Sequence, residues 1–213
     1  MKKIVKRIII IVLCITLNNS ALVSASEISS VNESNDMNAF IEKADNYLEV
    51  NDEGLIELDL PDNVVEMIGS DEYEKILQGI DEINSEVKSG EVIVTDNGTI
   101  YDISDEELVV QGGNVNKVVR HWWGFTRYAN NKASKKLAKK LYSNGSFCAL
   151  LSTGAGGVAF FPGASLPAGM LSVASGISSA WQSHLADRIT EENKGKGVKI
   201  TLTWCLIYTV KGQ

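Results

Sequence analysis

Hydrophobic residues recur at helical intervals in two segments of the first half of the chain. Over residues 36–50 the apolar positions lie three and four residues apart, which predicts an amphipathic helix of about 15 residues. A second apolar stripe over residues 73–87 predicts another helix. Ser70 and Asp71 are its candidate N-caps, and Gly90 is expected to end it because glycine readily adopts the left-handed conformation that follows a helix.

Alternating apolar and polar positions predict strands in three further segments. Residues 55–60 form one short candidate. Residues 91–103 predict a β-hairpin, because alternating segments flank an Asn97-Gly98 pair that tolerates the positive φ of a tight turn. Residues 198–210 alternate throughout and predict one long closing strand with a strongly apolar face. This strand needs partners, and the 91–103 hairpin is the expected supplier, which would join both halves of the chain in one α+β unit.

A basic helix is predicted over residues 132–141, with Asn130 or Asn131 as its N-cap. Its lysines project within about 140° of one another, opposite an apolar side. They are Lys132, Lys135, Lys136, Lys139 and Lys140. An aromatic cluster with Trp122 and Trp123 precedes the helix, and Arg127 lies beside it. An anionic membrane surface attracts such a combination; a solvated lysine face on a helix with core tryptophans is the alternative.

The stretch from Leu141 to Ala186 contains no Asp, Glu, Lys or Arg. Pro162 and Pro167 interrupt it, which predicts a helical hairpin. Small residues recur at four-residue intervals on its arms and include Gly157, Ala168, Ser172, Gly176 and Ala180. Such rows let helix backbones approach closely in lipid. We therefore expect either an induced insertion into membranes or a tightly packed hairpin in a soluble core.

The first 25 residues have the organisation of a secretory signal peptide. Basic residues precede an apolar run that is too short to span a bilayer as a helix, and small residues follow it. Val23 and Ala25 fit the positions before a cleavage site, so cleavage is expected after Ala25, with Ser26 as the next candidate. The mature chain is predicted to be secreted; an uncleaved anchor is the alternative.

Charge is distributed unevenly along the chain, although the net charge is only −7. Residues 26–116 contain 24 acidic residues against three lysines, a balance of −21, whereas residues 117–213 have a balance of +10. The uncharged residues 111–114 lie where the sign changes, which predicts a boundary between an acidic region (26–111) and a cationic domain (112–213). The acidic region is either a pro-region that neutralises the cationic domain or a solvated acidic surface.

Motifs for catalysis and for metal binding are missing from the sequence. Neither His121 nor His184 has a partner at ligand spacing, so no metal or other cofactor is expected. No nucleophile elbow, P-loop or metalloprotease motif occurs, and we expect neither enzymatic activity nor a nucleic-acid partner. Cys148 and Cys205 form either a disulfide, as exported proteins often do, or two independent buried thiols.

Four elements of the second half resemble a known group of proteins. The HWWGFTRY segment, the LAKKL helix, the Gly/Ala/Pro-rich stretch and the terminal GKGVKITLTWCLIYTVKGQ together resemble small exported, bacteriocin-like proteins of Gram-positive bacteria. The resemblance covers residues 111–213 and leaves the acidic region outside. It implies secretion and a membrane-directed antimicrobial action, and it assigns no catalytic residue.

The expected fold is α+β: acidic helices and a β-hairpin, then the basic helix, a hydrophobic Gly/Ala-rich helical hairpin and a C-terminal strand. The expected function is that of a secreted, cationic, membrane-active protein of bacteriocin or toxin type. In this hypothesis Trp122, Trp123, Arg127 and the lysines dock on anionic lipid, and residues 147–186 insert. The alternative is a soluble, non-enzymatic extracellular interaction protein, whose partner the sequence does not identify.

Overall fold

The computed structural model of the chain describes residues 32–103, 116–143, 147–152 and 174–213. Three predicted features lie outside these ranges. They are the signal peptide, the boundary at residues 111–114, and the centre of the uncharged stretch with Gly157, Ala168 and Ser172. The described residues form helices and antiparallel sheets, which confirms the α+β class.

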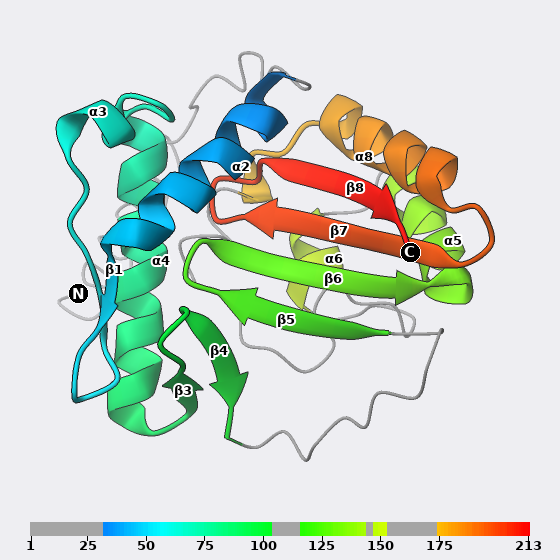
Figure 1. The fold of residues 1–213 in the computed structure, drawn as a ribbon. Coiled ribbons are helices and arrows are strands. Elements are labelled where there is room, and N and C mark those ends of the chain that lie inside the picture. Colours follow the sequence, from blue (N-terminus) through cyan, green and yellow to red (C-terminus); the bar gives the residue numbers. More distant parts are fainter. Residues whose placement is uncertain (1–31, 104–115, 144–146, 153–173) are drawn as a thin grey trace, which may run out of the picture.

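A six-stranded antiparallel sheet forms the centre of the molecule, and each strand pairs with the next along the chain (Figure 1). Its strands are β3 (Val92–Val94), β4 (Thr99–Asp102), β5 (Lys117–His121), β6 (Gly124–Asn130), β7 (Gly197–Thr203) and β8 (Tyr208–Gly212). The acidic region supplies β3 and β4, and the cationic region supplies the other four. One sheet therefore contains strands from both sides of the predicted boundary.

The described part of the acidic region, residues 32–103, forms three α-helices, a 3-10 helix and a separate two-stranded sheet. These are α2 (Asn32–Ala44), η1 (Asp45–Tyr47), β1 (Leu48–Val50), β2 (Ile56–Leu58), α3 (Asp62–Val65) and α4 (Ser70–Ser89). The helix predicted over residues 36–50 is wrong in its last part, because β1 pairs with β2. The second predicted helix is confirmed as α4. Gly69, rather than Ser70 or Asp71, is its N-cap, and it ends as predicted at Gly90, whose φ is 76°.

The predicted hairpin at residues 91–103 is confirmed, with Gly98 at a φ of 69° in its turn. The closing strand is wrong as one element, because a turn at residues 204–207 divides it into β7 and β8, and Leu206 has a φ of 63° there. The hairpin also does not pair with β7 directly, since β5 and β6 lie between them. The sequence did not reveal this β5–β6 hairpin, whose alternation is obscured by two tryptophans at its turn.

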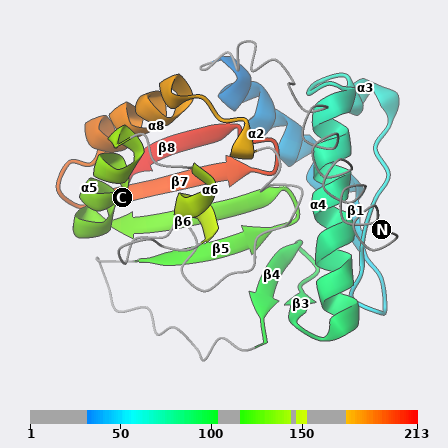
Figure 2. The ribbon, with the colours of Figure 1, turned by 180° about the vertical axis from the view of Figure 1, so that it is seen from behind.

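One face of the sheet is covered, as Figure 2 shows, by the described helices α5 (Asn131–Tyr142), α6 (Phe147–Ser152) and α8 (Ser179–Glu192). Asn130 caps α5 by accepting a hydrogen bond from the N–H of Ala133, as predicted. The second arm of the predicted helical hairpin is wrong as a continuous helix. Its chain leaves the helical path at residues 176–178, and Ser178 begins α8 by accepting from the N–H of Trp181.

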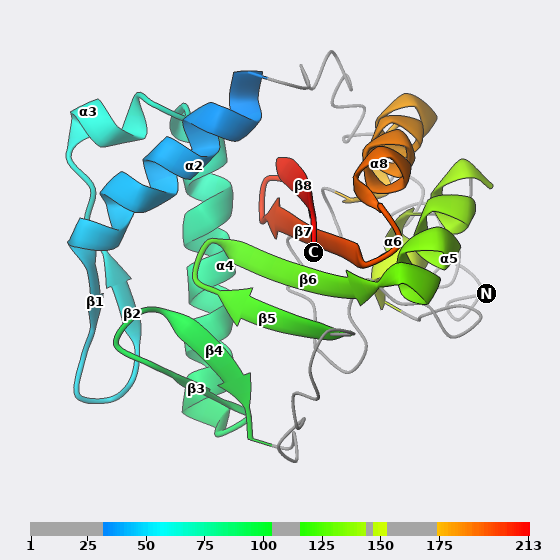
Figure 3. The ribbon, with the colours of Figure 1, turned by 45° about the vertical axis from the view of Figure 1, so that its right-hand side comes forward.

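The acidic helices pack at the end of the sheet where the β5–β6 and β7–β8 turns lie (Figure 3). Trp122, in the first turn, donates its indole N–H to Asp45 at 2.9 Å, and its ring centre lies 6.5 Å from that of Phe40. Trp204, in the second turn, packs against Gly79 of α4 and donates its indole N–H to the carbonyl of Trp122 at 2.6 Å. Both tryptophans are buried, so both turns pack against the acidic helices through apolar side chains.

A buried arginine forms the electrostatic part of the same contact between regions. Arg120 of β5 is 3% exposed, and its guanidinium lies 2.7 Å from a carboxylate oxygen of Glu86 on α4. It also lies 3.2 Å from a carboxylate oxygen of Asp102 on β4. One cation from the cationic region therefore compensates two anions from the acidic region.

We expect Gly79→Ala to destabilise the protein, although alanine is the better helix former. A Cβ at this position would lie 2.6 Å from Cδ1 of Trp204, and the hydrogen bond of Trp204 restricts its movement. Overpacking of this kind costs about 1–3 kcal/mol. Urea unfolding should show this loss, whereas Ser85→Ala, at an exposed position of the same helix, should leave stability unchanged or slightly raised. Equal stability of Gly79→Ala and wild type would contradict the packing.

Arg120→Ala is expected to reduce the free energy of unfolding by about 3–5 kcal/mol, because two largely buried carboxylates lose their counterion. Lys75→Ala is the matched control. It also removes a cation from an ion pair with a carboxylate on α4, but both side chains of that pair are about one-third exposed. Its loss should be below about 1 kcal/mol. Denaturant titration of both variants measures the difference, and similar losses would refute the role assigned to Arg120.

Candidate binding surfaces

The first candidate surface is the exposed side of α5. This lysine surface consists of Lys132, Lys135, Lys136, Lys139 and Lys140. All five side chains are exposed, whereas Leu137 and Leu141 on the opposite side of the helix are fully buried. The helix contains no Asp or Glu. The lysines therefore lie together on one face, as the spacing predicted.

Trp122 and Arg127 do not lie on this surface, so the expectation that they face lipid beside the lysines is wrong. The acidic region covers Trp122, which is 1% exposed. Arg127 is buried on the helix-covered face of the sheet. Its guanidinium donates to the carbonyls of Lys117 and Tyr128 and to the side-chain oxygen of Asn116. Burial lowers the pKa of Arg127 to about 10, so the side chain is still charged at neutral pH.

Two of the residues predicted to pack a helical hairpin, Gly176 and Ala180, are exposed. The prediction of close helix packing at these positions is wrong, because the chain turns at residues 176–178 instead of continuing as a helix. The other three, Gly157, Ala168 and Ser172, lie outside the described residues.

Of the two alternatives for Cys148 and Cys205, the structure shows no disulfide at Cys205, which is a free thiol. It lies in the β7–β8 turn, and its Sγ donates to the carbonyl of Glu72 near the start of α4. Burial raises the pKa of this thiol to about 12, so it remains protonated at neutral pH. The side chain of Cys148, its expected partner, lies outside the described residues.

The second candidate surface is the face of the sheet that α5, α6 and α8 leave uncovered; no described helix crosses β5–β8 there (Figure 1). Directly paired residues of neighbouring strands point to the same side, so the register arranges side chains in rows across the strands. The first row, here named the cationic row, is Lys117, Tyr128, Lys199 and Lys211. The second, the hydroxyl row, is Val119, Thr126, Thr201 and Thr209.

Tyr128 lies between two lysines of the cationic row. The ammonium nitrogens of Lys117 and Lys199 lie 5.5 and 5.8 Å from the centre of its ring, within the range of cation–π attraction. Lys199 and Lys211 are directly opposite in the ladder, an arrangement that destabilises a sheet when the charges are alike. None of these three lysines forms an ion pair within the part of the chain that the structure describes.

His121 lies at the border of this face, next to the hydroxyl row. Its ring stacks on that of Trp123, with centres 4.6 Å apart, and its Nε2 lies 3.3 Å from the hydroxyl oxygen of Thr126. Burial, and then the charge of Lys199, lower the pKa of His121 to about 4. The imidazole is therefore neutral at physiological pH.

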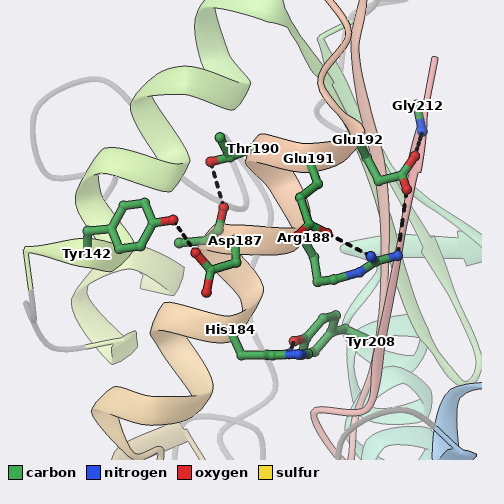
Figure 4. A network of polar contacts seen from close by, with 10 residues as sticks. Tyr142, His184, Asp187, Arg188, Thr190, Glu191, Glu192, Tyr208 and Gly212 are labelled. Atoms are coloured by element: carbon green, nitrogen blue, oxygen red, sulfur yellow. Dashed lines mark hydrogen bonds and ion pairs between the residues drawn. The ribbon is translucent and has the colours of Figure 1, made fainter.

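A polar network on the opposite side of the sheet joins α8 to α5 and β8 (Figure 4). Its members are Tyr142, His184, Asp187, Arg188, Thr190, Glu191, Glu192, Tyr208 and Gly212. Tyr142 donates its hydroxyl to Asp187, and His184 hydrogen-bonds to Tyr208. Burial raises the pKa of Tyr208 to about 12, so the phenol keeps its proton at neutral pH. We interpret the network as structural, because its contacts connect three elements of the fold.

The described ranges contain no group of His, Cys, Asp and Glu side chains that could hold a metal ion. Within the same ranges, no helix combines the length and the apolar character needed to cross a bilayer.

Sequence reasoning missed the cationic row because its members come from four different strands, and only the strand register aligns them. The alternation of Lys117, Val119 and His121 was the available signal. It becomes informative only once residues 117–130 are known to form a hairpin.

None of three comparisons, with protein families, with curated proteins and with solved structures, found a match to this chain.

Lys199→Gln is expected to raise the pKa of His121, because the positive charge of Lys199 disfavours protonation of the imidazole. An NMR titration of the histidine ring protons measures the shift, with His121→Gln used to assign the signal. Lys43→Gln, on an exposed lysine of α2, should leave the titration unchanged. An unaltered His121 titration in Lys199→Gln would refute the contact.

The same histidine makes stability depend on pH. Its native pKa of about 4 lies below the ordinary value of 6.5, so the unfolded chain binds a proton that the native protein does not between these pH values. The stability that this difference contributes is fully present above pH 6.5 and is lost as the pH falls towards 4. His121→Gln should flatten the stability profile in this window, as measured by urea unfolding at several pH values.

Proposed function

We propose that this is an exported, non-enzymatic protein that binds anionic membrane surfaces through the lysine surface of α5. The single observation that carries the proposal is the set of five exposed lysines on one helix without an acidic residue. Each cation held near an anionic bilayer contributes about 1 kcal/mol of attraction. Several together are enough for peripheral binding, and an action of bacteriocin or toxin type would begin with such docking.

The burial pattern favours docking on the surface over insertion of residues 147–186 as a unit. Phe147 and Leu151 of α6 and Trp181 and Leu185 of α8 are buried in the core. Removing each of them from the core costs about 1.5–3 kcal/mol unless lipid replaces the lost contacts. Binding through exposed lysines requires none of these changes, because Leu137 and Leu141 on the other side of α5 stay in place.

The charge of the lysine surface can be tested with vesicles and the chain without its predicted signal peptide, residues 26–213. We expect co-sedimentation with anionic phosphatidylglycerol vesicles at low salt and little with phosphatidylcholine vesicles. Lys136→Glu with Lys139→Glu, at the centre of the lysine surface, should weaken binding by at least about 30-fold, because two attractive contributions are lost.

The matched control is Lys43→Glu with Lys88→Glu. It changes the net charge equally, at two exposed positions in the last turns of α2 and α4, and should leave vesicle binding within two-fold of wild type. Circular dichroism confirms that both variants are folded. Absence of wild-type binding, or equal loss in both double variants, would overturn the proposal.

A further inference from the structure

The uncovered face of the sheet has a charge pattern that the packing of the fold does not explain. Its cationic row holds three lysines, and two of them oppose each other directly in the ladder. Like-charged partners at such positions destabilise a sheet. The strands of this face also carry no carboxylate: β5, β6 and β7 contain no Asp or Glu, and neither does β8. A negatively charged ligand would remove the repulsion.

The geometry of the row indicates an extended ligand. Neighbouring strands lie about 4.8 Å apart, so the four side chains of the row extend over about 14 Å. Lys211 and Lys199 lie on adjacent strands, and Lys117 lies two strands further on, beyond Tyr128. A ligand with anionic groups repeated at about the spacing of the strands would meet all three ammonium groups at once.

The hydroxyl row indicates which chemical groups the ligand carries besides its anionic groups. Thr201 and Thr209 stand next to Lys199 and Lys211 on β7 and β8, and both are half-buried. Threonine hydroxyls can donate and accept, which suits them to the hydroxyl groups of sugars. The face therefore has a row of ammonium groups, which also includes the phenol of Tyr128, beside a row of hydroxyl groups.

The aromatic rings favour a carbohydrate over a nucleic acid. Single-stranded nucleic acids bind to sheets by stacking bases on free aromatic faces. Here the ring of Tyr128 has an ammonium group near it from each neighbouring strand, and His121 and Trp123 stack on each other.

From these observations we infer that the uncovered sheet face binds an acidic polysaccharide built from uronic acid sugars. The carboxylates lie along Lys117, Lys199 and Lys211, and the sugar hydroxyls contact Thr201, Thr209 and Tyr128. This surface is on the side of the sheet opposite α5, so the inference is independent of membrane binding by the lysine surface.

The test uses a fluorescent oligogalacturonate and residues 26–213. Anisotropy at low salt should show binding that is lost at high salt and is absent for the methyl-esterified oligomer, which has the same sugars without the charge. Lys117→Gln with Lys199→Gln should weaken binding by about 25-fold, or about five-fold per lysine removed. Lys211→Gln alone should weaken binding about five-fold. Because Lys211 is exposed, this variant still tests the inference if the double variant fails to fold.

Two controls locate the site. Lys43→Gln with Lys88→Gln changes the net charge equally and should bind as wild type does. NMR provides a second readout: the oligomer should shift the ring signals of His121, which borders the face, and leave those of His184, which packs on the other side, in place. The Lys136→Glu, Lys139→Glu variant should retain oligogalacturonate binding, so failure of one proposal is distinguishable from failure of the other.

Four results would overturn the inference. They are absence of binding, equal binding of the methyl ester, equal loss in the control variant, and shifts confined to His184. Tighter binding of a single-stranded oligothymidylate of equal charge would also overturn it, because the face would then be a nucleic-acid surface.

Discussion

The contact of Arg120 with Glu86 and Asp102 is the interaction on which the arrangement of the molecule depends. The acidic and cationic regions carry opposite charge in large excess, and most of that charge is solvated. At Arg120 the two regions form a buried ionic contact, between α4, β4 and β5. A buried charge of this kind is tolerated only when its partners are fixed, so it specifies how the first hairpin joins the rest of the sheet.

Two buried tryptophans form the apolar part of the contact between the acidic and cationic regions. Trp122 and Trp204 come from turns that are far apart in the sequence, yet a hydrogen bond joins them, and the acidic helices bury both. This packing removes Trp122 from the surface and gives the acidic region a structural role in the fold. Lysines gather on the surface at α5 and on the uncovered sheet face, which lie on opposite sides of the sheet. The two surfaces differ in architecture, since one is the side of a helix and the other is a face of the sheet. A partner for one need not fit the other.

The elements with strong local signals could be predicted from the sequence. Helix α4 has a continuous apolar stripe and a terminal glycine, α5 has its asparagine cap, and the β3–β4 hairpin has its Asn-Gly turn. The failures occurred where tertiary contacts outweigh local pattern. Residues 204–207 continue the alternation of β7, but Trp204 turns inward against Gly79, and the strand ends. Residues 48–50 continue a helical pattern, but they pair with β2.

The sequence by itself determined the two opposite charge regions, the lysine surface of α5 and the α+β class, because each depends on spacing along one segment. The tertiary structure alone decided which aromatic and cationic residues are buried and which side chains of separate strands form a row. Trp122 and Arg127 are residue types that are common in membrane-binding clusters, but here both are buried in the protein core and hydrogen-bonded to it. Lys117, Lys199 and Lys211 are unremarkable in the sequence and become neighbours only through the register of the sheet. Burial and register are set by contacts between distant segments, and the periodicity of a single segment carries no information about them.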